Sequence, residues 1–117
     1  MDLDRARRLV TAERERIERL LLSAAAARAD DNDAERDAGD GDSDGAQPLE
    51  HESVDLAVER SLRQRLSALE RAEKRIAAGS YGLSVESGSP IPDERLEIDP
   101  AAELTVEEAA RHRHQDY

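Results

Sequence analysis

The sequence predicts a mainly α-helical protein, built as an antiparallel coiled-coil hairpin followed by a small knuckle of turns and a short C-terminal helix. Two long stretches place apolar residues at alternating steps of three and four, which is the spacing of one helix face. Leu, Ile and Val supply only 22 of the 117 residues, and the chain has no Phe, Trp or Cys. That is too little for a thick globular core, but it is enough for a narrow apolar stripe between two helices.

The first predicted helix covers residues 1–28. Its apolar residues form a heptad-like seam, in which Glu13 occupies the one polar position. The apolar residues of this seam are Leu3, Ala6, Val10, Ile17, Leu20, Ala24 and Ala27. Arg, Glu and Ala occupy most of the other positions, and all three are strong helix formers. The segment is slightly basic, with seven Arg against five acids.

An acidic connector is predicted over about residues 29–46, as the tip of the hairpin. Residues 30–44 hold eight acids against Arg36 alone, within a chain whose net charge is −11. Such a segment favours a solvated loop. Its run from Asp40 to Gly45 also fits the opening of a calcium loop. However, Gln47 and His51 stand where that pattern requires an apolar residue and a Glu.

The second predicted helix covers residues 47–78. Pro48 suits a first helical turn and Gly79 suits a C-terminal cap. The apolar stripe consists of Val54, Val58, Leu62, Leu66, Leu69, Ala72 and Ile76. Because nothing else in the chain is expected to bury the two stripes, they are predicted to face each other, so that residues 1–78 form one hairpin.

The C-terminal segment, residues 79–117, is different in composition. It contains three of the six Gly and three of the four Pro, separated by short apolar islands, and carries a net charge of −6. This pattern predicts turns and two short strands. Thr105 and Glu108 then match the capping box of a final helix that extends to about His112.

The residues of this segment carry a resemblance to the zinc-finger segment of the DksA/TraR family of bacterial transcription factors. The matching residues are Tyr81, Gly82, Gly88, Pro90, Ile91, Pro92, Arg95, Leu96, Glu97, Pro100 and Ala102. In that family two Cys-x-x-Cys pairs are separated by seventeen residues. Here Ser84 and Ser87 stand at the first pair of positions, and Thr105 and Glu108 at the second, with the same spacing.

This departure from the family predicts a degenerate finger without zinc, because serine and threonine hydroxyls are poor zinc ligands. No other cofactor is expected. The capping box, together with packing of Ile91, Leu96 and Leu104, is predicted to secure the knuckle instead.

The resemblance also implies a function. Family members insert their coiled coil into the secondary channel of RNA polymerase and carry an acidic Asp-x-Ala motif at its tip. Asp44-Gly45-Ala46 matches this motif, and the implied partner-binding tip consists of Asp44 and Ala46 with Asp40 and Asp42. Asp55-Leu56-Ala57 matches by letters, but it falls inside the second predicted helix. The implied role is that of a transcription regulator whose partner is RNA polymerase.

Composition excludes several other classes. The N-terminus lacks a signal sequence, and no apolar run is long enough to span a membrane, so a cytoplasmic protein is expected. The acidic balance disfavours direct DNA binding. No catalytic arrangement stands out, so an enzyme is not expected, and His112 and His114 fit a solvated tail. A monomer is favoured over a dimer. The alternatives are a coiled-coil adaptor or dimerisation protein and, less favoured, an acidic cation-binding protein.

Overall fold

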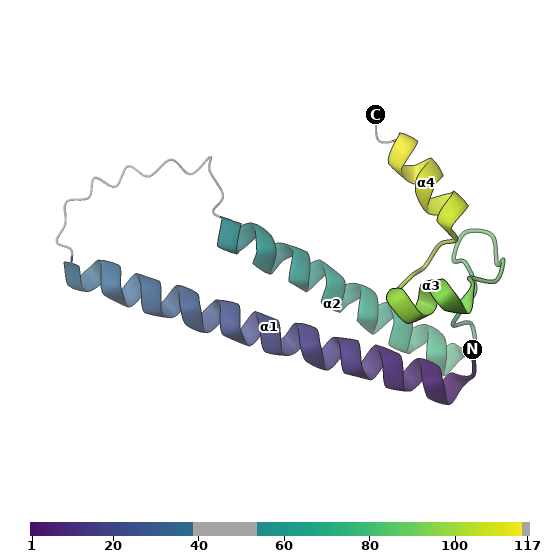
Figure 1. Ribbon diagram of the computed structural model, residues 1–117, viewed down its shortest axis with the longest axis horizontal. Helices are drawn as coiled ribbons and strands as arrows, with labels where there is room; N and C mark the ends of the chain where they lie inside the picture. The colour runs from purple at the N-terminus through teal and green to yellow at the C-terminus, as the bar shows by residue number, and fades with distance from the viewer. Residues whose placement is uncertain (39–53, 116–117) are drawn as a thin grey trace.

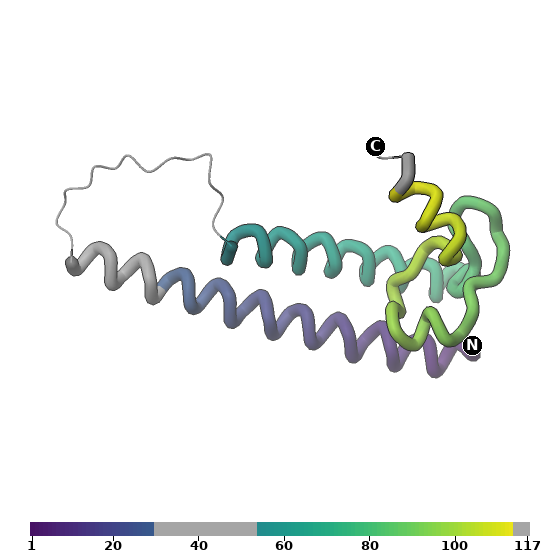
Figure 2. Tube along the Cα trace, turned by 45° about the horizontal axis from the view of Figure 1, so that its top comes forward, coloured from purple at the N-terminus to yellow at the C-terminus, as the bar shows by residue number. Residues whose placement is uncertain are grey.

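The computed structural model describes residues 1–38 and 54–115 and shows a long helical hairpin with a small unit against one end (Figure 1). Helix α1 (Leu3–Ala38) and helix α2 (Val54–Ala78) run antiparallel, followed by α3 (Asp93–Ile98) and α4 (Val106–Gln115). Residues 79–115, called the finger below, lie beside the first turns of α1 and the last turns of α2 (Figure 2). The predicted mainly helical class and the predicted hairpin are confirmed.

Helix α1 continues ten residues beyond its predicted end at residue 28, so the prediction of a tip loop from about residue 29 was wrong at its first boundary. The acidic composition of residues 29–38 suggested a loop, but the segment also contains Ala, Glu and Arg, which favour a helix. Each residue added to a formed helix gains one backbone hydrogen bond without a new nucleation cost. The rest of the predicted connector, residues 39–53, lies outside the described residues.

Helix α2 ends where the sequence predicts, and a backbone motif terminates it. Gly79 has a φ of +81°, a left-handed conformation that glycine adopts readily. Its N–H donates to the Ile76 carbonyl at 3.2 Å, and the Ser80 N–H donates to the Arg75 carbonyl at 2.9 Å. These two bonds form a Schellman cap. The predicted start of the helix at residue 47, with Pro48 in its first turn, lies outside the described residues.

A thin apolar seam joins the two helices. Its buried side chains are Ala6, Val10 and Ile17 from α1, Leu69, Ala72 and Ile76 from α2, and Ala101 from the finger. Away from the finger the seam is more open, since Leu20 and Val58 are 41% and 47% exposed. The core is therefore concentrated at the end of the hairpin that carries the finger.

Arginine–glutamate pairs along one flank of the seam define the register of the hairpin. Arg14 pairs with Glu73, and Arg28 pairs with Glu59, whose side chain is only 5% exposed. The two arginines are two heptads apart on α1, and the two glutamates are two heptads apart on α2. Leu21 and Leu66 occupy the heptad positions between them. A slip of one heptad in either direction would break both pairs and would place Leu21 and Leu66 opposite a charge, so this pattern favours the observed antiparallel alignment.

The finger is built mainly from turns. The predicted pair of strands is reduced to an isolated antiparallel bridge between Leu83 and Pro90, and the structure has no strand among the described residues. Helix α3 was not predicted. It begins after Pro92, with Asp93 and Glu94 in its first turn, and both features favour a helix start.

A second small apolar cluster fills the finger. Ile91, Leu96 and Ala102 are buried, and Met1 and Tyr81 pack against them. The Tyr81 hydroxyl donates a hydrogen bond to the Pro100 carbonyl at 2.8 Å. Predicted packing of Ile91 and Leu96 is confirmed, whereas Leu104 is only half-buried and lies outside the cluster. Helix α4 extends to Gln115, three residues beyond the predicted end.

The acidic finger is held on the hairpin by arginines. Arg65 pairs with Asp99 at 2.6 Å and also contacts Glu13 of α1 at 3.4 Å. Arg71 and Arg75 both pair with Glu103, at 3.0 and 3.1 Å. The Arg71 hydrogen bond lowers the pKa of Glu103 below its ordinary value, so this carboxylate stays charged in the interface.

The pairs Arg14–Glu73 and Arg28–Glu59, called the register pairs below, give a first prediction. Arg14→Glu places a negative charge among Glu18, Glu70 and Glu73, and is expected to lower the free energy of unfolding by about 1 kcal/mol. Adding Glu73→Arg restores an opposite-charge pair and should recover at least half of that loss in urea unfolding. Arg19→Glu, which makes the same charge change at an exposed site of α1, serves as control. If the double variant is as unstable as the sum of its single changes, the pair does not specify the register.

Candidate functional site

The predicted partner-binding tip lies outside the described residues. Asp40, Asp42, Asp44 and Ala46 all fall within residues 39–53, as does the calcium-loop pattern. Asp55, the competing match to the tip motif, lies in the first turn of α2 and is exposed. The assignment of the tip to Asp44 and Ala46 therefore stays a prediction.

The four positions at which the DksA/TraR family carries its zinc ligands are brought together in the finger. The Ser84 hydroxyl donates to Oε1 of Glu108 at 2.6 Å, and the Thr105 backbone N–H donates to the same oxygen at 2.9 Å. In return, the Glu108 N–H donates to Oγ1 of Thr105 at 3.2 Å. These last two bonds form the predicted capping box at the start of α4.

Ser84 also organises the turn on the other side of this cluster. Its Oγ accepts hydrogen bonds from the N–H groups of Glu86 at 3.0 Å and of Ser87 at 3.2 Å. Its carbonyl accepts from the N–H of Gly88, whose φ is +78°. A side chain that binds its own turn in this way stabilises a tight loop. The carboxylate of Glu108 thus joins the turn at residues 84–88 to the first turn of α4.

Hydrogen bonding keeps Glu108 ionised although its side chain is buried. Ser84, then Ser87, and then the backbone N–H of Thr105 lower the pKa of Glu108 to about 2, against the cost of burial. Its place in the first turn of α4 adds the favourable interaction of a carboxylate with a helix N-terminus. The result is a fully ionised carboxylate with its donors already in place.

Zinc does not fit this arrangement. Three of the four side chains offer only a hydroxyl oxygen. The one carboxylate already accepts hydrogen bonds from Ser84 and Thr105. In the described parts of the chain, no group of three or more His, Cys, Asp or Glu side chains is placed to hold a metal ion. His112, which lies nearby on α4, is 2.7 Å from the Glu86 carboxylate.

Sequence reasoning predicted the capping box but missed the bond between Ser84 and Glu108. The signal for it was present, since the family spacing places these positions at one point in space. A hydroxyl and a carboxylate brought together in a buried site form a hydrogen bond, because each loses its contact with water and would otherwise have no hydrogen-bonding partner. The register pairs of the hairpin were also missed, although their spacing of two heptads is visible in the sequence.

The lowered pKa of Glu108 predicts acid sensitivity of the finger. A carboxylate whose folded-state pKa is depressed contributes stability above its ordinary value of 4.5, and this contribution is lost as the pH falls toward about 2. Glu108→Gln removes the charge, so the variant should be less stable than wild type at about pH 6. The difference should shrink steadily below about pH 4.5.

Urea unfolding of both proteins across this range, together with amide hydrogen exchange in the finger, measures the effect. Glu107→Gln is the control, because Glu107 is the exposed neighbour in the same helix turn. A gap between wild type and Glu108→Gln that does not change with pH would show that the carboxylate's charge does not stabilise the finger.

None of the helices among the described residues is long and apolar enough to cross a membrane. No protein-family model matches the chain. It is similar to the RNA polymerase-binding transcription factor DksA from two strains of Caulobacter vibrioides, with 34% identity over 64 residues. This match covers 55% of the chain and 45% of each relative, so the chain matches somewhat less than half the length of these curated relatives.

A solved structure shares the fold. The structure of transcription factor DksA2 from Pseudomonas aeruginosa matches with a TM-score of 0.75 and 24% identity, over 97% of this chain and 84% of that chain. The match extends over both the hairpin and the finger. In fold and in the sequence of its matching segment, the chain is DksA-like, in agreement with its resemblance to the DksA/TraR family.

Proposed function

We propose that this chain is a transcription regulator that binds RNA polymerase through its helical hairpin, and that it is not an enzyme. The observation that carries the proposal is the shared architecture, in which a long hairpin with a finger at its base matches DksA2 over 97% of the chain. The sequence similarity to a factor named as RNA polymerase-binding supports the same conclusion. The known channel-binding mode of the family gives the mechanism.

The hairpin has the dimensions that this mechanism requires. At about 1.5 Å per residue, the 36 residues of α1 extend about 54 Å and the 25 residues of α2 about 38 Å. In this mechanism the hairpin enters the channel tip first, and the finger, which lies at the base of the hairpin, would limit the depth of insertion (Figure 1). Asp44 and Ala46 would then lie at the far end, near the catalytic centre.

The register pairs matter for this role because the hairpin must present its tip at a fixed depth. A slip of the helices past each other by one heptad would move the tip by about 10 Å. The Arg14–Glu73 and Arg28–Glu59 pairs oppose such a slip. Regulation would then follow from the charge and position of the tip, without any chemical step.

Substitutions at the tip test the mechanism. Asp44→Asn and Ala46→Thr should change the melting temperature little, because typical surface substitutions stay within ~0.5 kcal/mol. They should abolish or reverse the effect on transcription in a purified polymerase assay, while binding to the polymerase core weakens only modestly. Asp55→Asn is the matched control, since Asp55 carries the competing motif within α2.

Each outcome of this experiment has a distinct meaning. If Asp55 controls transcription and Asp44 does not, the tip has been assigned to the wrong residues. If wild type binds polymerase but none of these variants changes transcription, the hairpin only blocks the channel. If wild type does not bind the polymerase core, the channel mechanism is wrong and the adaptor alternative is favoured.

We also propose that the finger folds without zinc, held by the cluster of Ser84, Ser87, Thr105 and Glu108. Treatment with a strong zinc chelator should leave both the melting curve and polymerase binding unchanged, because the hydrogen bonds of Glu108 need no metal. Elemental measurement should find no stoichiometric zinc after dialysis. One zinc per chain, or a melting temperature that falls with chelation, would contradict this proposal.

A further inference from the structure

The contact between the hairpin and the finger, called the joint below, is made by ion pairs of one polarity. Every ion pair that the described residues form across it has its cation on the hairpin side and its carboxylate on the finger. These pairs are Met1–Asp93, through the amino group of Met1, Arg5–Glu97, Arg65–Asp99, Arg71–Glu103 and Arg75–Glu103. Dissolved salt therefore weakens all of these attractions together.

Much of this charge is open to solvent. In the pairs Arg5–Glu97 and Arg65–Asp99 every side chain is between 30% and 43% exposed. The Debye length falls from about 10 Å at 0.1 M salt to about 3 Å at 1 M, and exposed pairs are the ones that salt screens most. The joint is thus more sensitive to ionic strength than a contact between buried charges.

Apolar packing across the joint is limited to a few side chains. Ala101 is a buried residue of the finger that belongs to the apolar core of the hairpin, and Tyr81 packs against both apolar clusters. Among the described helices only α1 and α2 pack side by side over several residues, so neither α3 nor α4 forms a helix–helix interface with the hairpin. The angle of the finger therefore depends strongly on the charges.

One cation of the joint is held there at a cost. The side chain of Arg75 is only 12% exposed, and its Nη1 donates to Glu103 at 3.1 Å. Its Nε and Nη2 atoms are buried and have no hydrogen-bond partner. Buried donors without a partner are unfavourable, because they have lost water and gained no other acceptor. Opening of the joint would return these donors to water, so the closed arrangement carries an opposing term.

A pivot lies where the chain passes from the hairpin to the finger. Helix α2 ends at Ala78, and Gly79 follows with its left-handed φ of +81°. Apart from its chain neighbours, no atom lies within 4 Å of the place that a Cβ would take at Gly79. Residues at the end of an element commonly act as hinges, because they absorb changes of backbone angle. Rotation after this cap would move the finger and leave α2 intact.

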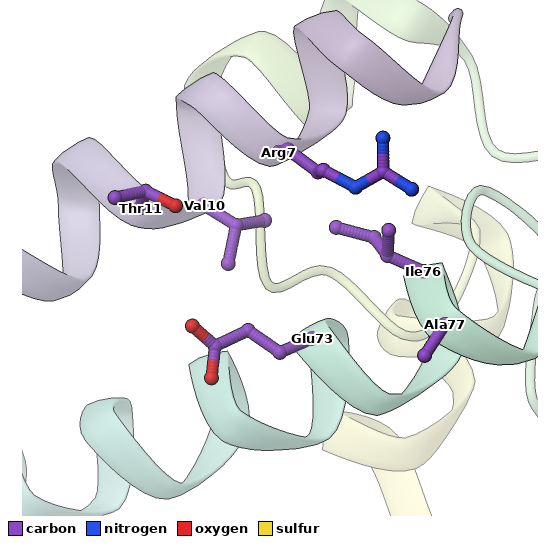
Figure 3. Close-up of a pocket in the computed structure, with 6 residues that line it drawn as sticks. All are labelled: Arg7, Val10, Thr11, Glu73, Ile76 and Ala77. Atoms are coloured by element: carbon purple, nitrogen blue, oxygen red, sulfur yellow. The ribbon is translucent and has the colours of Figure 1, made fainter.

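The finger is bound to one face of α2 at the base of the hairpin. Its Glu103 pairs with Arg71 and Arg75. Ala77 lies two positions beyond Arg75, and therefore on nearly the opposite side of the helix. There it lines a pocket of about 300 Å³ between the first turns of α1 and the last turns of α2 (Figure 3). Among the described residues, none from the finger lines this pocket, so the finger can rotate away without being enclosed.

We propose that the joint is a hinge controlled by ionic strength. At low salt the ion pairs hold the finger in the closed arrangement, and at high salt the finger rotates about Gly79 while the hairpin keeps its fold. The hairpin resists the same salt because its helices share a buried apolar seam, and apolar burial is not screened. This device concerns the chain alone and does not rest on the proposed function.

The distance between two spin labels on the full chain tests the hinge. The chain contains no Cys, so Ser67→Cys on α2 and Ser89→Cys in the finger place the labels at two defined, exposed sites. One exposed pair changes an equilibrium about twofold, so screening of the whole set from about 0.1 to about 1 M NaCl should raise the long-distance population about tenfold. Helicity by circular dichroism should stay constant. Glycine at the same osmolarity should have no effect, because a zwitterion does not screen charges.

Two variants with the same loss of charge separate the ion pairs from the buried donors. Arg71→Met removes two hydrogen bonds to Glu103, and should raise the long-distance population at about 0.1 M NaCl about fivefold. Arg75→Met removes one bond to Glu103 together with two unpartnered donors, and the methionine keeps most of the apolar stem. Its long-distance population should be no larger than that of wild type.

Each contrary result overturns a stated part of the proposal. A label distance that does not change up to about 1 M NaCl means that the joint is not a hinge controlled by ionic strength. An equal change in glycine would show an osmotic effect, and a loss of helicity with the change would show unfolding. If Arg75→Met opens the finger as far as Arg71→Met does, the buried donors do not oppose closure. None of these results depends on a partner, so the proposed function stands or falls separately.

Discussion

The antiparallel alignment of α1 and α2 depends on arginine–glutamate pairs beside a very thin apolar seam. Small and medium side chains such as Ala6, Ala72 and Val10 bury area but distinguish poorly between alternative alignments. The pairs at Arg14 and Arg28 supply that distinction, because a charge moved opposite a leucine loses its partner. The placement of the finger depends on the same alignment, because its acids pair with both helices: Arg5 of α1 pairs with Glu97, and Arg71 and Arg75 of α2 pair with Glu103.

The finger depends on polar contacts because its apolar core is small. Its apolar cluster contains only Ile91, Leu96 and Ala102 with two partly buried neighbours, which is a small core for a unit of this size. The buried carboxylate of Glu108 compensates by joining two segments that are far apart in the sequence. Its bonds to Ser84 and Thr105 are stronger than neutral ones, because the acceptor is ionised.

Sequence reasoning predicted the hairpin, the Gly79 cap and the Thr105–Glu108 capping box, because each depends on a local pattern of spacing or residue type. It failed where two local preferences competed, as in residues 29–38, whose acidity suggested a loop while Ala, Glu and Arg favoured a helix. It also missed contacts between distant segments, such as Ser84 with Glu108 and Arg14 with Glu73. Those contacts become visible only when the fold brings the segments together, although heptad spacing offered a hint for the second.

Separate hydrogen bonds hold the centre of the finger, so each substitution there lowers the stability of the finger by a limited amount. A metal site fails as a unit, since removal of one ligand releases the ion and with it the whole binding energy. A helix cap costs about 1 kcal/mol when its side chain is removed, and the remaining bonds persist. A change at Ser84, Ser87 or Thr105 therefore weakens the finger by a step, so neutral drift can alter these positions one at a time while the unit stays folded.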